Sequence, residues 1–128
     1  MNLATYFENV KGTGILATCD YEGNVDAAIY ARPYLIDEQT IALSMMERLS
    51  YMNIKSNPKA CYMFVEKTEG FKGLRMYLTM AGEENDQQRI REIKKMHSVN
   101  YKPDDRRHLV YFRIENTWPL VGDKADER

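Results

Sequence analysis

Residues 41–58, IALSMMERLSYMNIKSNP, have the pattern of a buried strand, a polar corner and a short helix. The alternate residues Ile41, Leu43 and Met45 fall on one face of the strand, as expected when that face packs on a core. Asn57-Pro58 ends the helix, because the residue before a proline is disfavoured in the helical region. The chain on both sides is therefore interpreted around this strand–helix junction.

The corner of the junction carries groups that suit a phosphate. Ser50 is the predicted N-cap of the helix, and Leu49 and Ile54 are placed to form a hydrophobic staple across it. A helix start presents unpaired backbone N–H groups and the positive end of the helix dipole, and Arg48 stands beside it. The alternative is an ordinary junction with a solvated arginine. The local pattern by itself favours that alternative, since most helix starts bind nothing.

The remaining chain predicts five further strands and two further helices. Apolar periodicity and turn formers place helices at residues 2–10 and 83–97 and strands at residues 15–19, 25–32, 60–65, 74–81 and 108–115. Six strands joined by tight turns argue for a mainly β (α+β) antiparallel barrel with helical additions. The longer helix is expected to turn Ile90, Ile93 and Met96 inward. We expect one domain over residues 1–122 and a frayed tail at residues 123–128.

The composition indicates one folded domain without a strong electrostatic field. The chain has 128 residues, 44% of them hydrophobic, and 18 Lys+Arg stand against 19 Asp+Glu for a net charge of −1. This balance would gather neither nucleic acid nor an anionic membrane. No apolar run approaches the roughly 20 residues of a membrane span, and the N-terminus lacks the pattern of a secretory signal. We therefore expect no nucleic-acid partner and no membrane partner.

Two cysteines, Cys19 and Cys61, both fall in predicted strands. Their positions indicate buried, reduced thiols of a cytoplasmic protein. A disulfide or half of a metal site stays open as an alternative, but no second cysteine pair or histidine spacing indicates zinc. The expectation is a cytoplasmic protein without a metal site.

Conventional catalytic motifs are absent from the sequence. The two histidines, His97 and His108, do not indicate a catalytic triad, and there is no Gly-x-Gly-x-x-Gly and no Walker loop. Catalytic residues therefore stay unassigned. Trp118, the only tryptophan, either packs an irregular chain end onto the barrel or stacks on a planar ligand, and both readings are open.

Five segments in register resemble one family, the FMN-binding split barrel of the pyridoxamine 5′-phosphate oxidase type. In chain order they are GILAT at 14–18, DYEGN at 20–24, AAIYARP at 27–33, IALSMM at 41–46 and NIKSNPKACYMF at 53–64. An opening Gly-x-Leu-Ala-Thr strand, an Asp…Gly hairpin and an Asn-Pro helix before a strand are similar to this family. The resemblance covers roughly residues 5–82, and the later strand and chain end match only by position.

The resemblance implies a six-stranded antiparallel Greek-key split β-barrel with flanking helices, which forms a homodimer and holds FMN at the subunit interface. The phosphate would lie at the corner beside Arg48 and Ser50, and Arg75, Tyr77 and Trp118 would reach the flavin bound by the partner. In full, the residues implied for cofactor binding are Ala28, Ile29, Tyr30, Ala31, Arg32, Leu43, Ser44, Met45, Met46, Arg48, Leu49, Ser50, Asn53, Arg75, Tyr77 and Trp118.

The sequence departs from the family at one point. Leu49-Ser50 stands where the family commonly has an Arg-Lys pair, and Arg48 lies one residue earlier. A single arginine fork with the helix-start amides still suits a phosphate dianion. The function implied is an FMN flavoprotein, either an oxidoreductase or an electron carrier. Pyridoxamine phosphate oxidase activity is not expected, because no basic segment follows Trp118 to hold a second phosphate.

Two other functions stay open. The first is a non-catalytic binding module of the same fold for haem, for a deazaflavin or for stored FMN. The second is a dimeric barrel that has lost its ligand, which the Leu49-Ser50 departure favours.

Overall fold

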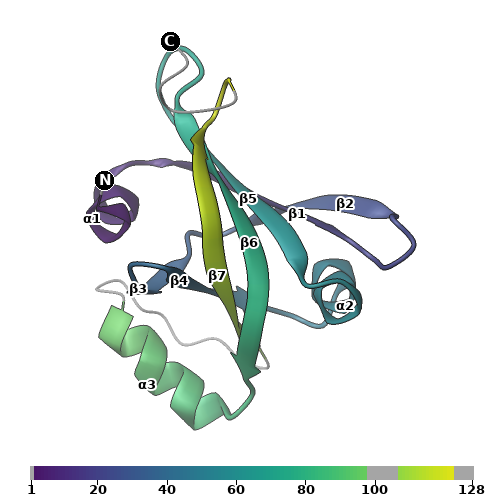
Figure 1. Cartoon of the computed structure of the whole chain (residues 1–128). Helices are drawn as coiled ribbons and strands as arrows, with labels where there is room; N and C mark the ends of the chain where they lie inside the picture. The colour runs from purple at the N-terminus through teal and green to yellow at the C-terminus, as the bar shows by residue number, and fades with distance from the viewer. Residues whose placement is uncertain (1, 98–106, 123–128) are drawn as a thin grey trace.

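One antiparallel sheet runs through the structure, a computed structural model that describes residues 2–97 and 107–122 (Figure 1). The elements in chain order are α1 (Leu3–Asn9), β1 (Gly12–Cys19), β2 (Val25–Tyr30), β3 (Tyr34–Asp37), β4 (Thr40–Met45), α2 (Leu49–Ser56), β5 (Lys59–Glu66), β6 (Gly73–Glu84), α3 (Gln87–His97) and β7 (His108–Pro119). Within the described residues the sheet has seven strands in the order β2-β1-β5-β6-β7-β4-β3. The predicted mainly β antiparallel class is confirmed. The predicted tail at 123–128 lies outside the described residues.

The prediction of six strands is wrong by one, and the additional strand is β3. Its four residues follow Pro33 directly and are too few to show an alternating pattern. Pairing with β4 forms this strand, for example between Leu35 and Ile41, and the register shifts before Asp37. β2 ends at Tyr30, two residues before the predicted end at residue 32, and Pro33 lies between β2 and β3.

The strands β1, β5, β6 and β7 are longer than the pattern predicts, and the difference is largest for β6 and β7. β6 continues through Gly82, whose φ of +158° permits a bend where the register to β7 shifts. Glu83 and Glu84, which the sequence pattern places in the helix predicted at residues 83–97, therefore lie in a strand, and the helix begins at Gln87. β7 continues to Pro119, so Trp118 lies in a paired strand and not in an irregular chain end.

The main core lies between the sheet and the first two helices. The predicted alternation in β4 is confirmed, since Ile41, Leu43 and Met45 are at most 1% exposed. Phe7 of α1 and Ile54 of α2 pack into the same cluster as the buried rings of β5. Each apolar side chain buried in this way stabilises the fold by about 1.5–3 kcal/mol. The burial of Ile54 therefore holds α2 against the sheet and sets the position of its start relative to β4.

A second, smaller cluster joins α3 to the sheet, and its buried members are Ala42, Ile90 and Leu109. The predicted inward stripe of α3 is only partly right, because Ile90 is buried whereas Met96 is 77% exposed. Lys94 is buried instead. Residues four apart share one helix face, so Ile90 and Lys94 both face the strands.

The other face of β2, β1, β5 and β6 is apolar and open. Residues directly opposite each other in paired strands point to the same side, so the register defines this face. It carries Ile15, Ala17, Val25, Ala27, Ile29, Cys61, Met63 and Tyr77. Val25 is 82% and Ile29 is 71% exposed, so no described residue covers this end of the sheet. We call this surface the bare sheet face, and exposed apolar patches of this kind mark interaction sites.

Neither cysteine is in a disulfide. Cys19 and Cys61 are free thiols, and both are half-buried rather than fully buried as predicted. Burial raises the pKa of the Cys61 thiol, which keeps it in the uncharged form. No helix of the part of the chain that the structure describes is both long enough and apolar enough to cross a membrane.

Candidate functional site

A cavity of about 420 Å³ lies between β2 and β4 beside the start of α2. Its lining comes from β2 and the residues after it, from β3, from the second half of β4, from the corner and from the residue before β7. The lining residues are Asp26, Ala28, Ile29, Tyr30, Ala31, Arg32, Tyr34, Leu43, Ser44, Met46, Arg48, Leu49, Ser50 and Arg107. We call this cavity the β2–β4 pocket.

The pocket exists because two sheet edges face it. β2 is the end strand of the sheet on one side. On the other side β3 pairs with β4 only over Thr40–Ala42, so residues 43–45 have no partner from β3. Backbone N–H and C=O groups at such edges are obligatory hydrogen-bonding groups. The pocket therefore offers donors and acceptors for a planar ligand that carries amide-like groups.

Most residues that the family resemblance implies for cofactor binding lie together in this pocket. Those that line it are Ala28, Ile29, Tyr30, Ala31, Arg32, Leu43, Ser44, Met46, Arg48, Leu49 and Ser50. Met45 does not, because its side chain is 0% exposed in the core. Asn53 does not either, since it is buried and its amide donates to Thr18 Oγ1 at 3.1 Å. Both residues therefore lie in the interior and not in the pocket lining.

The helix start at the corner differs from the prediction. Arg48 is the N-cap residue in an extended conformation, and its side chain makes no capping hydrogen bond. Ser50 therefore lies inside the first turn, where its hydroxyl is 3.5 Å from Asp26 Oδ2. Leu49 is 58% exposed, so the predicted hydrophobic staple with Ile54 does not form. The first N–H groups of α2 consequently lack a side-chain cap from Arg48, and the residues of this helix start line the pocket.

Two guanidinium groups act on this corner. Burial raises the pKa of Tyr30, and this is opposed by a hydrogen bond with Ser50 and by the positive charges of Arg107 and Arg48. Both arginines are therefore close enough to Tyr30 for their positive charges to lower its pKa, and both line the pocket. Asp26 supplies one negative charge at the same corner, where its carboxylate is 3.5 Å from the Ser50 hydroxyl, against the two positive charges. The corner is cationic and suits an anionic group such as a phosphate.

Sequence reasoning missed Arg107 together with Asp26 and Tyr34. Arg107 lies 59 positions beyond Arg48 in the chain and is brought to the corner by the pairing of Met45 with His108. The pair of arginines directly before β7 was the available signal. Without knowledge of which strand neighbours β4, that signal could not be placed at the corner.

The residues that follow β2 form one wall of the pocket, and hydrogen bonds to the neighbouring structure hold this wall in place. Arg32 Nη1 donates to the carbonyl of Phe7 at 2.7 Å, which ties the wall to α1. The hydroxyl of Tyr62 donates to the carbonyl of Ala31 at 3.1 Å. Since Tyr62 is 0% exposed, this second bond joins the pocket wall to the rigid core.

The remaining predicted group, Arg75, Tyr77 and Trp118, lies on the bare sheet face and not in the pocket. The Arg75 guanidinium is 5.6 Å from the centre of the Trp118 ring, and the Tyr77 and Trp118 rings are 5.1 Å apart. Arg75 also donates to the carbonyls of Pro119, at 3.0 Å, and of Gly122. These residues pack on one another in this chain, so their approach to a partner's cofactor stays a prediction.

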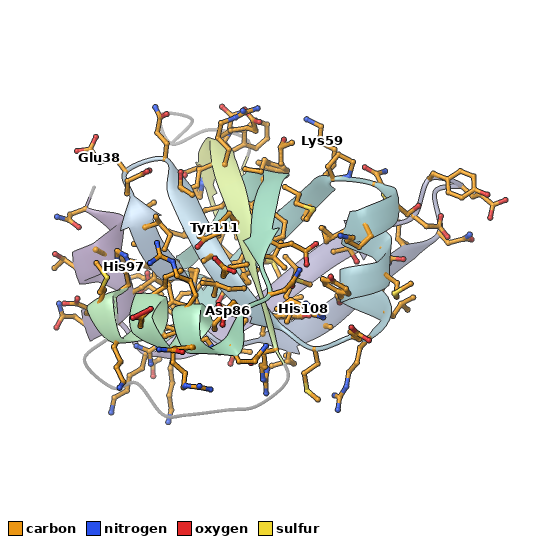
Figure 2. The ribbon with its side chains drawn as sticks, turned by 90° about the horizontal axis from the view of Figure 1, so that it is seen from below. Glu38, Lys59, Asp86, His97, His108 and Tyr111 are labelled. Atoms are coloured by element: carbon orange, nitrogen blue, oxygen red, sulfur yellow. The ribbon has the colours of Figure 1, made fainter. Side chains whose placement is uncertain are left out.

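Histidines do not form a catalytic arrangement with each other. His97 ends α3 and His108 begins β7, and Figure 2 shows the two well separated. The His108 ring stacks on Tyr51 with centroids 4.3 Å apart, and its Nε2 is 3.0 Å from Glu47 Oε1. The described residues include no group of three or more histidine, cysteine, aspartate or glutamate side chains that could hold a metal ion.

Glu83 of β6 anchors α2, the helix whose start forms the corner. Its carboxylate accepts a hydrogen bond from Tyr51 at 2.7 Å and pairs with the ammonium of Lys55. Burial opposes ionisation of Glu83, but these hydrogen bonds prevail and lower its pKa below the ordinary 4.5. The ionised carboxylate is thus the form that holds the helix.

Replacing Glu83 by glutamine is expected to destabilise the fold by about 1–2 kcal/mol at pH 7, because hydrogen bonds to a charged group contribute about 1.5–3 kcal/mol and solvent at the half-exposed Lys55 screens part of this. A carboxyl with a lowered folded pKa stabilises the protein above its unfolded pKa and loses that contribution as pH falls through the folded pKa. The difference between wild type and Glu83→Gln should therefore shrink below pH 4.5 in urea unfolding series. Glu92→Gln on the exposed side of α3 serves as control. A difference that is constant with pH would contradict this account.

Comparison with solved structures identifies the fold. An FMN-binding protein from Syntrophomonas wolfei subsp. wolfei is 19% identical with a TM-score of 0.76, and the match covers 94% of this chain and 85% of that one. A candidate pyridoxamine 5′-phosphate oxidase from Lactobacillus delbrueckii is 17% identical with a TM-score of 0.70, covering 90% and 88%. A protein named F420 reductase is 17% identical with a TM-score of 0.64, covering 83% and 88%.

No protein-family model matches the sequence, and no curated protein does. The structural similarity therefore establishes the fold: the chain has the split-barrel architecture of FMN-binding and pyridoxamine 5′-phosphate oxidase-like proteins. The resemblance read from the five sequence segments is confirmed at that level.

Proposed function

We propose that this protein is a homodimeric FMN flavoprotein that works as an oxidoreductase or as an electron carrier. The observation that carries the proposal is the β2–β4 pocket, where two open strand edges meet a helix start flanked by Arg48 and Arg107. A phosphate and a planar ring with amide-like edges are the two halves of FMN. The open strand edges of the pocket would suit the ring, and the helix start with its two arginines would suit the phosphate.

The residues present fit this cofactor. Arg48, Arg107 and the uncapped first turn of α2 would hold the phosphate by charge-assisted hydrogen bonds. Residues 28–32 and 43–46 would contact the ring and the ribityl chain through backbone groups and side chains. When bound, FMN supplies the capacity to accept and pass on a hydride or single electrons, and the protein orients it.

Arg107 offers a physical answer to the departure at Leu49-Ser50. The family commonly places two basic residues in sequence at the corner, whereas this chain has one there. We propose that Arg107, arriving from the strand next to β4, supplies the second positive charge. The departure would then change where the charge comes from and not whether FMN binds.

The bare sheet face supports the homodimer. An open apolar sheet face costs stability in water and is commonly buried against another chain. The face includes β2, which also lines the pocket and whose Ile29 belongs to both surfaces, so a partner docked here would lie beside the cofactor. Arg75, Tyr77 and Trp118 are on the same face, and we propose that they contribute from one subunit toward the flavin of the other.

Ala17→Asp is expected to weaken the dimer by about 3 kcal/mol or more, roughly 100-fold, because a carboxylate would be buried at the interface without a partner. Ala17 is exposed near the middle of the bare sheet face, so the isolated chain should still fold. Sedimentation equilibrium measures the change, and Gln88→Asp on the exposed surface of α3 is the control. A dimer of unchanged strength would place the interface elsewhere.

The proposal is tested by the absorption spectrum of the purified protein, before and after incubation with FMN and desalting. We expect a flavin spectrum that stays with the protein at about one FMN per chain. A protein that releases all added FMN would overturn the proposal and leave the ligand-less barrel. The same spectrum reads out the other candidates, because haem and deazaflavin absorb at different wavelengths.

A deazaflavin is the second candidate, since one neighbour of the same fold is named F420 reductase. Titration with both cofactors decides between them. Binding of the deazaflavin at a lower concentration than FMN would replace our first choice. We also propose a cytoplasmic location, which the two free cysteines fit.

A further inference from the structure

Lys94 is an unusual lysine because it is almost completely buried. Its side chain is 1% exposed, whereas its neighbour Lys95 on α3 is exposed. The ammonium donates to Ser44 Oγ at 2.7 Å and lies 5.9 Å from the centre of the Tyr34 ring. Ser44 and Tyr34 both line the β2–β4 pocket. Lys94 therefore stands directly behind one wall of the pocket.

The hydrogen bond between Lys94 and Ser44 can run in only one direction. An ammonium has three donors and no acceptor, so the serine oxygen accepts and its own hydrogen must point elsewhere. Within residues 2–97 and 107–122, no acceptor takes the hydrogen of the Ser44 hydroxyl. Ser44 keeps part of its surface open, on a strand edge that faces the pocket. In the pocket this hydrogen is open to solvent in the free protein and to an acceptor of a bound ligand.

Burying an ammonium is expensive unless its surroundings compensate for the lost water. Lys94 lies on the helix face that packs against the strands, and the Ser44 hydroxyl is one of the groups that compensate its ammonium there. A cation that served only solubility would lie on the solvent side of α3, as Lys95 does. The position of the charge, at the back of a ligand cavity, is what requires explanation.

We propose that Lys94 is a positioning residue that turns the Ser44 hydroxyl into a fixed donor to the bound ring and makes the pocket favour the reduced ring. The acceptor would be a carbonyl oxygen or an unprotonated nitrogen of the ring. Charge near a flavin tunes its electronics, and a buried positive charge stabilises the electron-rich, reduced form over the oxidised form. This inference rests on the proposed flavin function and adds to it the residue pair that sets the redox preference.

The test is the midpoint potential of bound FMN, measured by equilibration with a reference dye in wild type, Lys94→Met, Ser44→Ala and Lys95→Met. Methionine keeps the length of the buried chain without its charge. We expect Lys94→Met to reduce the preference for reduced over oxidised flavin about tenfold, which for a two-electron couple lowers the potential by about 30 mV. Ser44→Ala should lower it in the same direction, and Lys95→Met should leave it unchanged.

The combined variant Lys94→Met/Ser44→Ala separates a shared role from two independent ones. If Lys94 acts through Ser44, the double variant should shift the potential by less than the sum of the single shifts. Thermal melting of each variant shows whether it folds, and Ser44→Ala still tests the pair if Lys94→Met does not fold.

The outcomes distinguish this inference from the function on which it rests. A wild type that binds no flavin overturns both. A wild type that binds flavin, together with variants that keep the wild-type potential, overturns the role of Lys94 and Ser44 and leaves the flavoprotein intact. If Lys95→Met shifted the midpoint potential by the same amount, the shift would come from the change in net charge, and the specific role of Lys94 would also be overturned.

Discussion

Removing both arginines at the corner, as Arg48→Ala/Arg107→Ala, is expected to weaken FMN binding by about 3–6 kcal/mol. Each charge-assisted contact to a phosphate contributes about 1.5–3 kcal/mol, and both guanidinium groups line the same corner of the pocket. The single variants should each lose about 1.5–3 kcal/mol. Titration followed by quenching of flavin fluorescence measures all three affinities.

Riboflavin is the matched control for this prediction, because it has the ring and the ribityl chain but no phosphate. If the arginines hold the phosphate, the variants should bind riboflavin as the wild type does while losing affinity for FMN. Arg91→Ala, an exposed residue of α3, controls for the loss of a positive charge. Equal losses for FMN and riboflavin would mean that the arginines support the pocket and do not contact the phosphate.

The contribution of Arg107 also shows what a single sequence can and cannot indicate about a site. The β2 and β4 segments of the pocket were implied by the family resemblance, and the alternation of residues within each segment predicted that they are strands. Arg107 was not predicted, because it reaches the corner only through the register of β4 on β7, where Met45 pairs with His108. Pairing between strands far apart in the chain leaves no periodic mark in either strand.

The same distinction explains the errors in the fold. β3 forms because a neighbour is available to pair with it, and its four residues carry no pattern of their own. Glu83 and Glu84 have the charge expected at a helix start, yet Gly82 lets the strand continue through them. Lys94 looks like a solvated residue in a basic helix end, and only the packing of Ile90 on the sheet turns it inward. In each case the sequence indicated the local chemistry of the segment, but contacts with distant parts of the chain determined its structure.

Gly14 is a position where the family-like motif has a direct physical reason, and Gly14→Ala is expected to destabilise the fold by about 2–4 kcal/mol. An added Cβ would lie 2.0 Å from the hydroxyl of Tyr62 and 2.7 Å from the carbonyl oxygen of Tyr30. Tyr62 cannot move aside, because it is 0% exposed and packed against Phe7. Overpacking costs about 1–3 kcal/mol, and losing the bond from Tyr62 to the Ala31 carbonyl adds about 1 kcal/mol.

Urea unfolding of Gly14→Ala, Tyr62→Phe and the double variant tests this explanation. Tyr62→Phe removes the nearest atom, so in the Gly14→Ala background it should restore part of the lost stability. The rescue should be incomplete, because a ring carbon at 2.6 Å and the Tyr30 carbonyl remain in the way. Thr13→Ala, exposed on the same strand, should change stability by no more than about 0.5 kcal/mol. If Gly14→Ala were as mild as Thr13→Ala, the glycine would not be needed for close packing, and the anchoring of the pocket wall by Tyr62 would lose its basis.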